Sequence, residues 1–141
     1  MLQNYTMNSI SKTIETNFAH INLLENKIGH VHFKANIEIN KEIQFQLLAS
    51  YKQLTDHPIP FIYTSEEFLS STKDAPKHAK IVEKQSPINM KVLVVQNLAQ
   101  RILAKFYYKI HKPINPYKVC SSFDDGIKWI NDNRNNLNPA L

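Results

Sequence analysis

The residues from Lys84 to Lys118 carry the side chains best suited to chemistry, because together they could attract an anion. Glu83 is the last acid before Asp124, so every charged residue between these two is a cation. The seven cations are Lys84, Lys91, Arg101, Lys105, Lys109, Lys112 and Lys118. A local field of that sign can attract phosphates, acidic lipids or an acidic protein. The alternative is a solvated basic face that only keeps the chain in solution.

Four of these cations line up along one side of a helix expected over residues 97–111, three of them within it and Lys112 directly after it. They recur at spacings of four and three, which makes them candidate anion-binding residues: Arg101, Lys105, Lys109 and Lys112. A second arc of this helix is apolar and wide enough to pack on a sheet, and it consists of Leu98, Ala99, Ile102, Leu103, Phe106, Tyr107 and Ile110. Aromatic rings packed in that way cannot stack on bases, so the pattern disfavours a nucleic-acid partner.

Three hydroxyl side chains precede a second expected helix, over residues 75–85. Ser70, Ser71 and Thr72 could cap the start of this helix, since hydroxyl oxygens accept hydrogen bonds from the first N–H groups. A hydroxyl at a helix N-terminus is also a suitable phosphorylation site, because the helix end stabilises the added phosphate. We therefore keep the three residues as candidate phospho-acceptors, with capping as the alternative.

The other side chains suited to catalysis or metal binding do not form a recognisable set. His30 and His32 point to one face of an expected strand and could bind a metal with a third ligand, but no cysteine or acid nearby suggests one. We expect a solvent-facing pair and no metal site. Cys120, the single cysteine, lies in a short apolar strand, where burial is favoured over a reactive low-pKa thiol.

The glycine content excludes several common activities. The chain has two glycines, Gly29 and Gly126, whereas phosphate-binding loops need several at fixed spacing. The serine-hydrolase elbow and the zinc-protease motif are also missing. No acid, base and nucleophile converge in the sequence. We therefore expect a protein that is not an enzyme and uses no cofactor.

The elements that must position these residues alternate between strands and helices. In chain order we expect a hairpin of strands 19–25 and 31–35, a helix 41–55, a strand 61–64, a helix 75–85, a strand 92–95, a helix 97–111, a strand 117–120 and a helix 123–132. Asn40 and Ser122 are expected N-caps, and the continuous apolar run 92–95 is typical of a strand buried on both faces. This order predicts an α/β fold with a mixed, mostly parallel sheet of about five strands and about four helices.

The length of 141 residues suits one domain. We expect residues 1–12 to form a flexible N-terminal arm, residues 13–133 a single α/β domain, and residues 134–141 an Asn-rich C-terminal tail. The apolar runs are too short for a transmembrane segment, and the N-terminus lacks the basic and apolar parts of a secretory signal. With a single cysteine, these features predict a cytoplasmic location.

The segment KIHKPINPYKVCSSFDDGIKWI resembles the C-terminal motif of a family of small bacterial proteins, common in Bacteroidetes and often described as STAS-like. In that motif a Lys-Pro-x-x-Pro turn is followed by a short strand, a Phe and a helix with a Trp near its end. The matching residues are Lys112, Pro113, Pro116, Phe123 and Trp129. The upstream order of elements also fits, so the resemblance extends over roughly residues 13–133.

The resemblance implies the fold of anti-sigma-factor antagonists, in which helices wind along a sheet, a fold class that also serves lipid carriers. In antagonist STAS domains a Ser or Thr at the start of the second main helix is phosphorylated, and Ser70, Ser71 and Thr72 lie in the matching region. The first functional hypothesis is therefore a non-enzymatic protein-interaction or signalling module of STAS-like type, either alone or as a homodimer. The second is a lipid or small-anion binding protein that uses the basic patch near residues 97–111.

Overall fold

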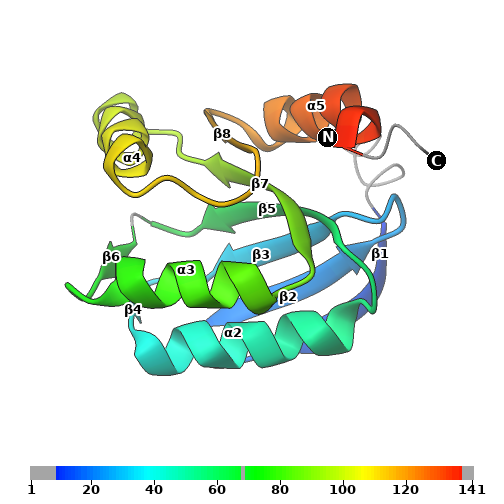
Figure 1. Ribbon diagram of the computed structural model, residues 1–141, viewed down its shortest axis with the longest axis horizontal. Coiled ribbons are helices and arrows are strands. Elements are labelled where there is room, and N and C mark those ends of the chain that lie inside the picture. The colour runs from blue at the N-terminus through cyan, green and yellow to red at the C-terminus, as the bar shows by residue number, and fades with distance from the viewer. Residues whose placement is uncertain (1–8, 68, 138–141) are drawn as a thin grey trace.

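The computed structural model describes residues 9–67 and 69–137 and contains a six-stranded sheet (Figure 1). The spatial order of the strands is β1-β2-β3-β5-β7-β8. Their bounds are Ile10–Glu15 for β1, Ala19–Leu24 for β2, Gly29–Phe33 for β3, Ile59–Ser65 for β5, Ile88–Val94 for β7 and Tyr117–Cys120 for β8. β1, β2 and β3 pair antiparallel, whereas β3, β5, β7 and β8 run parallel. The predicted α/β class with a mixed, mostly parallel sheet is confirmed.

A helix follows each parallel strand along the chain. The helices are α2 (Lys41–Leu54), α3 (Ala75–Gln85), α4 (Leu98–Ile110) and α5 (Phe123–Asn133), and the 3₁₀ helix η1 (Arg134–Leu137) comes last. Two short strands, β4 (Glu38–Ile39) and β6 (Ser70–Ser71), pair in parallel outside the main sheet. Each helix and strand expected from the sequence is present. Among the helices of the described ranges, none is long and apolar enough to cross a membrane.

The two faces of the sheet have separate apolar cores. On one face α2 packs its buried stripe against the sheet, and α3 lies alongside α2 (Figure 1). The stripe contains Leu47, Tyr51 and Leu54, at the helical spacing that the sequence predicts. On the other face α5 packs Ile127 and Ile130 against the sheet. In Figure 1 α4 lies beside β7 and β8 at one end of the sheet, away from α2.

Side-chain caps start three of the four α-helices in the described part of the chain. Asn40 Oδ1 and Ser122 Oγ each accept a hydrogen bond from the N–H three residues later, at 2.9 and 3.1 Å, as the sequence predicts. Asn97 Oδ1 caps α4 in the same way, at 3.1 Å. These caps satisfy N–H groups that have no partner within the helix, so they fix where α2, α4 and α5 begin.

The ends of the domain differ from the sequence-based expectation. β1 pairs with β2, so residues 10–12 belong to a strand and not to the flexible arm predicted over residues 1–12, of which 1–8 lie outside the described residues. β1, β4 and β6 also raise the strand number above the expected five. At the other end, the Arg134 guanidinium donates to the carbonyls of Asn26 (2.9 Å) and Lys27 (3.1 Å). This anchors the start of η1 within the predicted tail, whose residues 138–141 lie outside the described residues.

Candidate binding site around helix α4

Helix α4 buries much less of its surface than the sequence predicts. Tyr108 is its one fully buried residue, with 8% of its surface exposed. The large apolar side chains of the predicted packing arc are 57–64% exposed, and they are Leu98, Ile102, Leu103, Phe106 and Ile110. The prediction that this arc packs on the sheet is therefore wrong. We call Leu98, Ile102, Phe106 and Ile110 the α4 outer face, because Leu103, although exposed, also lines the cavity described below. Because Phe106 belongs to it, the argument that packed rings disfavour nucleic acid loses its basis there.

The opposite side of α4 holds the helix to the domain through aromatic rings. The Tyr108 ring lies 5.0 Å from the ring of Tyr117 in β8 and 5.6 Å from the ring of Tyr107. At the C-terminal end of the helix, the His111 ring lies 4.9 Å from the Tyr107 ring. Ring pairs at these separations favour a fixed arrangement, so α4 is attached along one edge while its outer face stays open.

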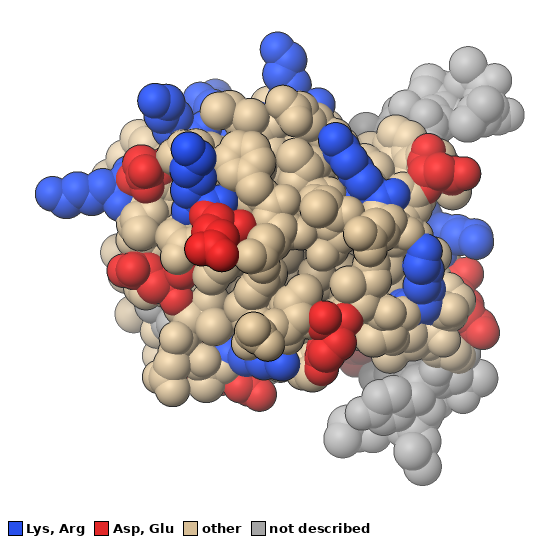
Figure 2. Space-filling model, turned by 90° about the horizontal axis from the view of Figure 1, so that it is seen from below, with Lys and Arg blue, Asp and Glu red and all other residues tan. Residues whose placement is uncertain are grey.

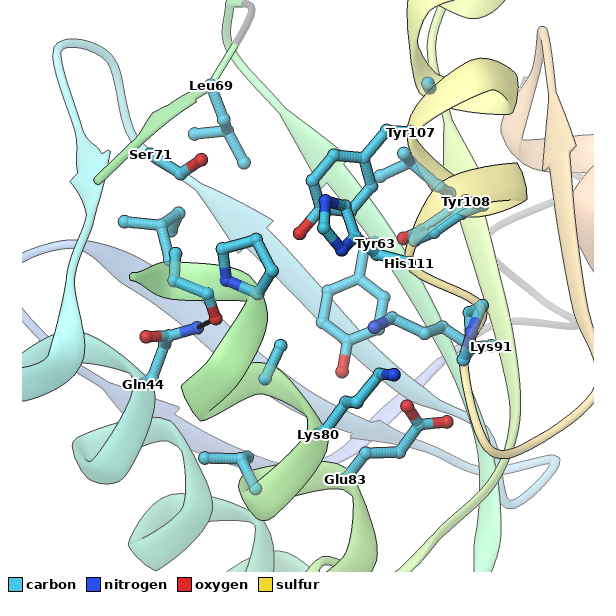
Figure 3. Close-up of a pocket in the computed structure, with 18 of the residues that line it drawn as sticks. Gln44, Tyr63, Leu69, Ser71, Lys80, Glu83, Lys91, Tyr107, Tyr108 and His111 are labelled. Carbon is cyan, nitrogen blue, oxygen red and sulfur yellow. Dashed lines mark hydrogen bonds between the residues drawn. The ribbon is translucent and has the colours of Figure 1, made fainter. Parts of the chain in front are cut away.

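A cavity of about 400 Å³ lies between the inner side of α4, helix α3 and the sheet (Figure 3). We call it the α3–α4 cavity. Much of its wall is apolar, with contributions from Phe33, Leu47, Leu69, Val82 and Leu93. Polar side chains reach it from four elements and from the end of α4, and they include Tyr51, Tyr63, Lys80, Glu83, Lys91 and His111.

Lys91 enters this cavity because alternate residues of β7 point to opposite faces of the sheet. Val92 and Val94 belong to the core under α5, and Lys91 and Leu93 lie on the other face, where they are only partly buried. The sequence predicts a strand buried on both faces, and this is correct for one face only. The reason is that α4 leaves a cavity over the second face instead of packing on it.

The Lys91 ammonium lies between two aromatic rings. Its Nζ is 5.7 Å from the ring centroid of Tyr63 and 5.6 Å from that of Tyr108, within the range of cation–π attraction. Burial acts to lower the pKa of Lys91, but Tyr108, Tyr63 and Glu83 more than offset that effect, so the pKa lies above its usual value. Lys91 therefore contributes a positive charge to the cavity at neutral pH.

Two buried tyrosines line the floor of the cavity. The Tyr63 hydroxyl donates a hydrogen bond to the Tyr51 hydroxyl at 3.1 Å. Burial raises the pKa of both hydroxyls above the ordinary value for tyrosine. Both phenols are therefore neutral at physiological pH and can act as hydrogen-bond donors.

Glu83 is the acidic residue that lines the cavity, and its carboxylate already accepts hydrogen bonds from the protein. Its Oε2 accepts hydrogen bonds from the backbone N–H of Asn115 (3.0 Å) and from Asn115 Nδ2 (3.1 Å). The same amide group donates to the Ile88 carbonyl at 2.9 Å. These bonds tie the loop that follows α4 to α3 and β7, so the carboxylate of Glu83 has a structural partner of its own.

The four candidate anion-binding residues have different surroundings. The Arg101 guanidinium donates to two carbonyls of the loop before α4, at 3.3 and 2.7 Å. Lys105 and Lys109 are exposed beside the α4 outer face, and Lys112 borders the α3–α4 cavity. Their role in anion binding stays a prediction. The sequence analysis counted Lys91 among the seven cations but did not select it as an anion-binding residue, although a cation directly before a continuous apolar run was a usable signal.

The hydroxyl residues before α3 do not cap that helix. Ser70 and Ser71 form β6, are exposed and border the cavity. Thr72 Oγ1 donates to Asp74 Oδ1 at 2.7 Å, and Asp74, at the N-cap position, makes no side-chain capping bond. The capping interpretation is therefore wrong for Ser70, Ser71 and Thr72. Their proposed role as phospho-acceptors is untested and stays a prediction.

Three histidines meet on the face of the sheet that α5 covers in part. His30 Nε2 and His32 Nδ1 each lie 2.7 Å from Thr64 Oγ1, and the His20 ring stacks on that of His32 with centroids 6.2 Å apart. The His30 ring lies 4.9 Å from the Phe123 ring, so it is covered and not solvent-facing as predicted. Burial, with a smaller effect of His32, lowers the pKa of His30 to about 4. Within residues 9–67 and 69–137, no three His, Cys, Asp or Glu side chains are placed to share a metal ion.

Cys120 is buried at the end of β8, as the sequence predicts. Its Sγ donates to the Ser122 carbonyl at 3.3 Å. Burial raises the pKa of the thiol, so the alternative of a reactive low-pKa thiol is wrong.

The charged surface over α2 and α3 shows no continuous basic area. On this face, seen in Figure 2, Lys and Arg side chains are interspersed with Asp and Glu around a broad uncharged region. The net charge of +5 is therefore not concentrated there. This leaves α4, which carries cations and no acid, as the distinctly basic helix of the described part of the chain.

Comparison with known protein families gives one match. The model described as Domain of unknown function (DUF7793) matches residues 22–134, and the chain belongs to this family. The match begins within β2 and ends at the start of η1, so it includes α4 and the elements that line the cavity. No curated protein and no solved structure matches the chain.

Proposed function

We propose that this member of the DUF7793 family is a non-enzymatic interaction module that docks a partner protein on the α4 outer face. The observation that carries the proposal is the exposure of four large apolar side chains on one face of a helix that is attached by its other side. Leu98, Ile102, Phe106 and Ile110 recur every fourth residue, so they form one continuous row. Contiguous exposed apolar surface of this kind marks interaction sites.

The charges beside this row indicate the chemistry of the partner. Lys105 and Lys109 are exposed along the α4 outer face, and α4 has no acid of its own. A matching partner presents an amphipathic helix with apolar side chains bordered by Asp or Glu. The apolar side chains would pair with the row on α4, and the acids would lie opposite the two lysines.

Charge also disfavours two other occupants of the α4 outer face, a second copy of the chain and a membrane surface, relative to such a partner. A second copy that packed its own α4 face to face would bring the lysines of both helices together, and like charges at an interface are repulsive. A membrane-surface helix is usually rich in Lys and Arg, each adding about 1 kcal/mol on an anionic surface. On α4 the exposed cations are Lys105 and Lys109, since the Arg101 guanidinium is held by the loop before the helix. We therefore keep self-association and membrane binding as outcomes of the test.

The kinship with STAS-like anti-sigma-factor antagonists is part of this proposal. It is supported by the order of strands and helices, with helices following each parallel strand, and by the turn at Pro113 and Pro116. Phosphorylation of Ser70, Ser71 or Thr72 would belong to the same signalling role. Ser70 and Ser71 border the cavity that α4 also lines, and none of the three residues belongs to the α4 outer face.

The test is site-specific photo-crosslinking in the native host. A benzoylphenylalanine replaces Phe106, and a control variant carries it in place of Lys128, which is exposed on α5. A protein captured from position 106 and not from position 128 is then purified, and its affinity is measured by calorimetry. We expect Phe106→Ser to weaken binding by about 2 kcal/mol, or roughly thirtyfold in Kd, as for a central interface residue.

Three results would contradict the proposal. One is a concentration-dependent dimer of the purified chain that Phe106→Ser abolishes, which would identify a second copy as the occupant. Another is binding to anionic vesicles that depends on Phe106. The third is equal affinity of the purified partner for wild type and for Phe106→Ser. Support requires a captured segment with acidic and apolar residues, and an affinity that falls with added salt and with the double substitution Lys105→Glu and Lys109→Glu.

A further inference from the structure

The α3–α4 cavity has the dimensions and walls of a small-molecule site. Its volume of about 400 Å³ falls within the roughly 300–1,000 Å³ typical of ligand pockets. Apolar side chains from β3, α2, α3 and β7 form most of the wall. The α4 residues that line it are Leu103, Ala104, Tyr107 and Tyr108, none of which belongs to the row Leu98, Ile102, Phe106 and Ile110. A ligand here would therefore be a second binding partner, distinct from the docked protein.

Lys91 supplies a charge inside these walls that has no direct hydrogen-bond or ion-pair partner among the described residues. Its neighbours are the rings of Tyr63 and Tyr108, which attract a cation but leave its three N–H donors unused. An anionic ligand would supply the acceptors that these N–H donors lack.

The charges around Lys91 also favour an anion. Lys80 and Lys112 border the cavity as well, and the single acid there, Glu83, is held by Asn115. Figure 3 shows Lys80 and Lys91 extending from α3 and β7 toward the space beside Tyr63. Three lysines and one carboxylate leave a formal excess of two positive charges, which would repel a cationic ligand.

A neutral donor lies next to the lysines. Tyr51 and Tyr63 share one hydrogen bond between their hydroxyls, so one of the two O–H groups has no acceptor in the described part of the protein. Both tyrosines line the cavity. This O–H group could donate to the ligand, and an ammonium beside a phenol can hold the two oxygens of one carboxylate.

We infer that the α3–α4 cavity binds a small molecule with an apolar body and one terminal carboxylate. The apolar walls would hold the body, and Lys91, assisted by the Tyr51–Tyr63 pair, would hold the carboxylate. This inference gives the lipid or small-anion hypothesis of the sequence a location, with Lys91 as the principal cation.

The test uses three probes that share a ten-carbon chain: decanoate, decanol and decyltrimethylammonium. Isothermal titration measures their binding to wild type, to Lys91→Met and to the control Lys105→Met, which removes an exposed lysine of α4. We expect decanoate to bind wild type with a Kd on the order of 10 µM. Lys91→Met should weaken decanoate by roughly tenfold to a hundredfold, as expected for a hydrogen bond to a charged group, and Lys105→Met should have no effect.

A second pair of variants keeps the test decisive if Lys91→Met fails to fold. Ala104 lines the cavity on the inner side of α4, whereas Ala99 is exposed on the same helix. Ala104→Trp fills the cavity and should abolish decanoate binding, and Ala99→Trp should leave it unchanged. Circular dichroism verifies that both variants retain the wild-type fold.

Several results would overturn the inference. Absence of saturable decanoate binding to wild type below about 1 mM would show that the cavity does not hold such a ligand. Equal affinity for decanol or decyltrimethylammonium would show that no carboxylate is recognised. Binding that survives in folded Ala104→Trp, or that Lys91→Met leaves unchanged, would place the ligand elsewhere.

Discussion

Helices α4 and α5 are built alike but are placed differently on the same sheet. Each follows a parallel strand, each starts at a side-chain cap, and each has one apolar side. α5 buries its apolar side through Ile127 and Ile130, whereas α4 exposes the residues of its outer face. The comparison teaches that amphipathic spacing identifies an apolar side without identifying what covers it. On α5 the cover is the sheet, and on α4 we propose that it is another protein.

The residues beneath each helix explain the difference. Under α5, a Cβ added to Gly126 would lie 2.6 Å from Ile62 Cδ1 and 2.9 Å from Val92 Cγ1, so the helix approaches the sheet as closely as glycine permits. Under α4 lie the ring of Tyr108 and the side chain of Lys91, with Nζ 5.6 Å from the ring centroid. These bulky groups hold α4 away from the sheet and leave the cavity beside them.

The largest expected effect is the difference in stability loss between truncating a buried apolar residue of α5 and truncating an exposed apolar residue of α4. Ile130 of α5 is fully buried against the sheet, so Ile130→Ala should lower the free energy of unfolding by about 3–4 kcal/mol. Phe106→Ala on α4 should change it by less than about 0.5 kcal/mol, because that ring is exposed. Urea denaturation of both variants measures the difference. Similar losses in the two variants would show that the α4 outer face is packed in the free chain.

The second effect is the pH dependence of stability that comes from His30, whose ring packs against Phe123, the first residue of α5. The pKa of His30 is about 4 in the folded chain and 6.5 in the unfolded chain, so between these values the unfolded state binds the extra proton. Stability should therefore fall as the pH drops from about 6.5 to 4, by at most about 3 kcal/mol. In His30→Gln this part of the pH dependence should vanish, as measured by urea denaturation at pH 7 and pH 4. Parallel pH profiles for wild type and variant would refute the burial of His30.

The third effect compares two small residues on the inner sides of the helices. Gly126→Val should cost about 2 kcal/mol, because its side chain would overlap Ile62 and Val92. Ala104→Val points into the cavity and should cost less than about 1 kcal/mol, mostly through lower helix propensity. Thermal unfolding followed by circular dichroism gives both values. A larger loss for Ala104→Val would mean that α4 lies as close to the sheet as α5.

The smallest effect comes from the helix caps. Ser122→Ala removes the acceptor for the Asp125 N–H and should lower the global free energy of unfolding by about 1 kcal/mol. Asn97→Ala removes the corresponding bond at α4, and we expect it to accelerate amide exchange at Gln100 more than it lowers global stability. Hydrogen exchange with NMR detection distinguishes local opening at Gln100 from global unfolding. Global destabilisation of equal size by both variants would mean that α4 contributes as much to the folded domain as α5.

The sequence predicted the helices and the central strands of this fold far better than its edge strand and its shortest strands. Asn40 and Ser122 were recognisable caps, and the proline pairs marked the ends of helices, so each expected helix is present. β1 was missed because its residues, ISKTIE, are mostly polar and exposed, as is usual for an edge strand. β4 and β6 have two residues each, which is too short for any periodicity.

The candidate site was predictable only in part. The basic row on α4 and the apolar arc beside it were both visible in the sequence, but their exposure depends on tertiary packing that no local pattern encodes. Lys91 was noticed only as a cation, because its place in the cavity depends on the register of β7 with β5 and on the distance of α4 from the sheet. The Tyr51–Tyr63 pair joins two elements and leaves no sequence signal.

The most direct test of the docking proposal is hydroxyl-radical footprinting of Phe106, with Trp129 of α5 as the internal reference. Phe106 is 60% exposed in the free chain, so it should oxidise readily in the purified protein. Inside the native host we expect oxidation of Phe106 to fall at least severalfold relative to Trp129, because a partner covers the α4 outer face. An unchanged ratio of Phe106 to Trp129 oxidation in the host would contradict the account, since the exposed face would then have no occupant.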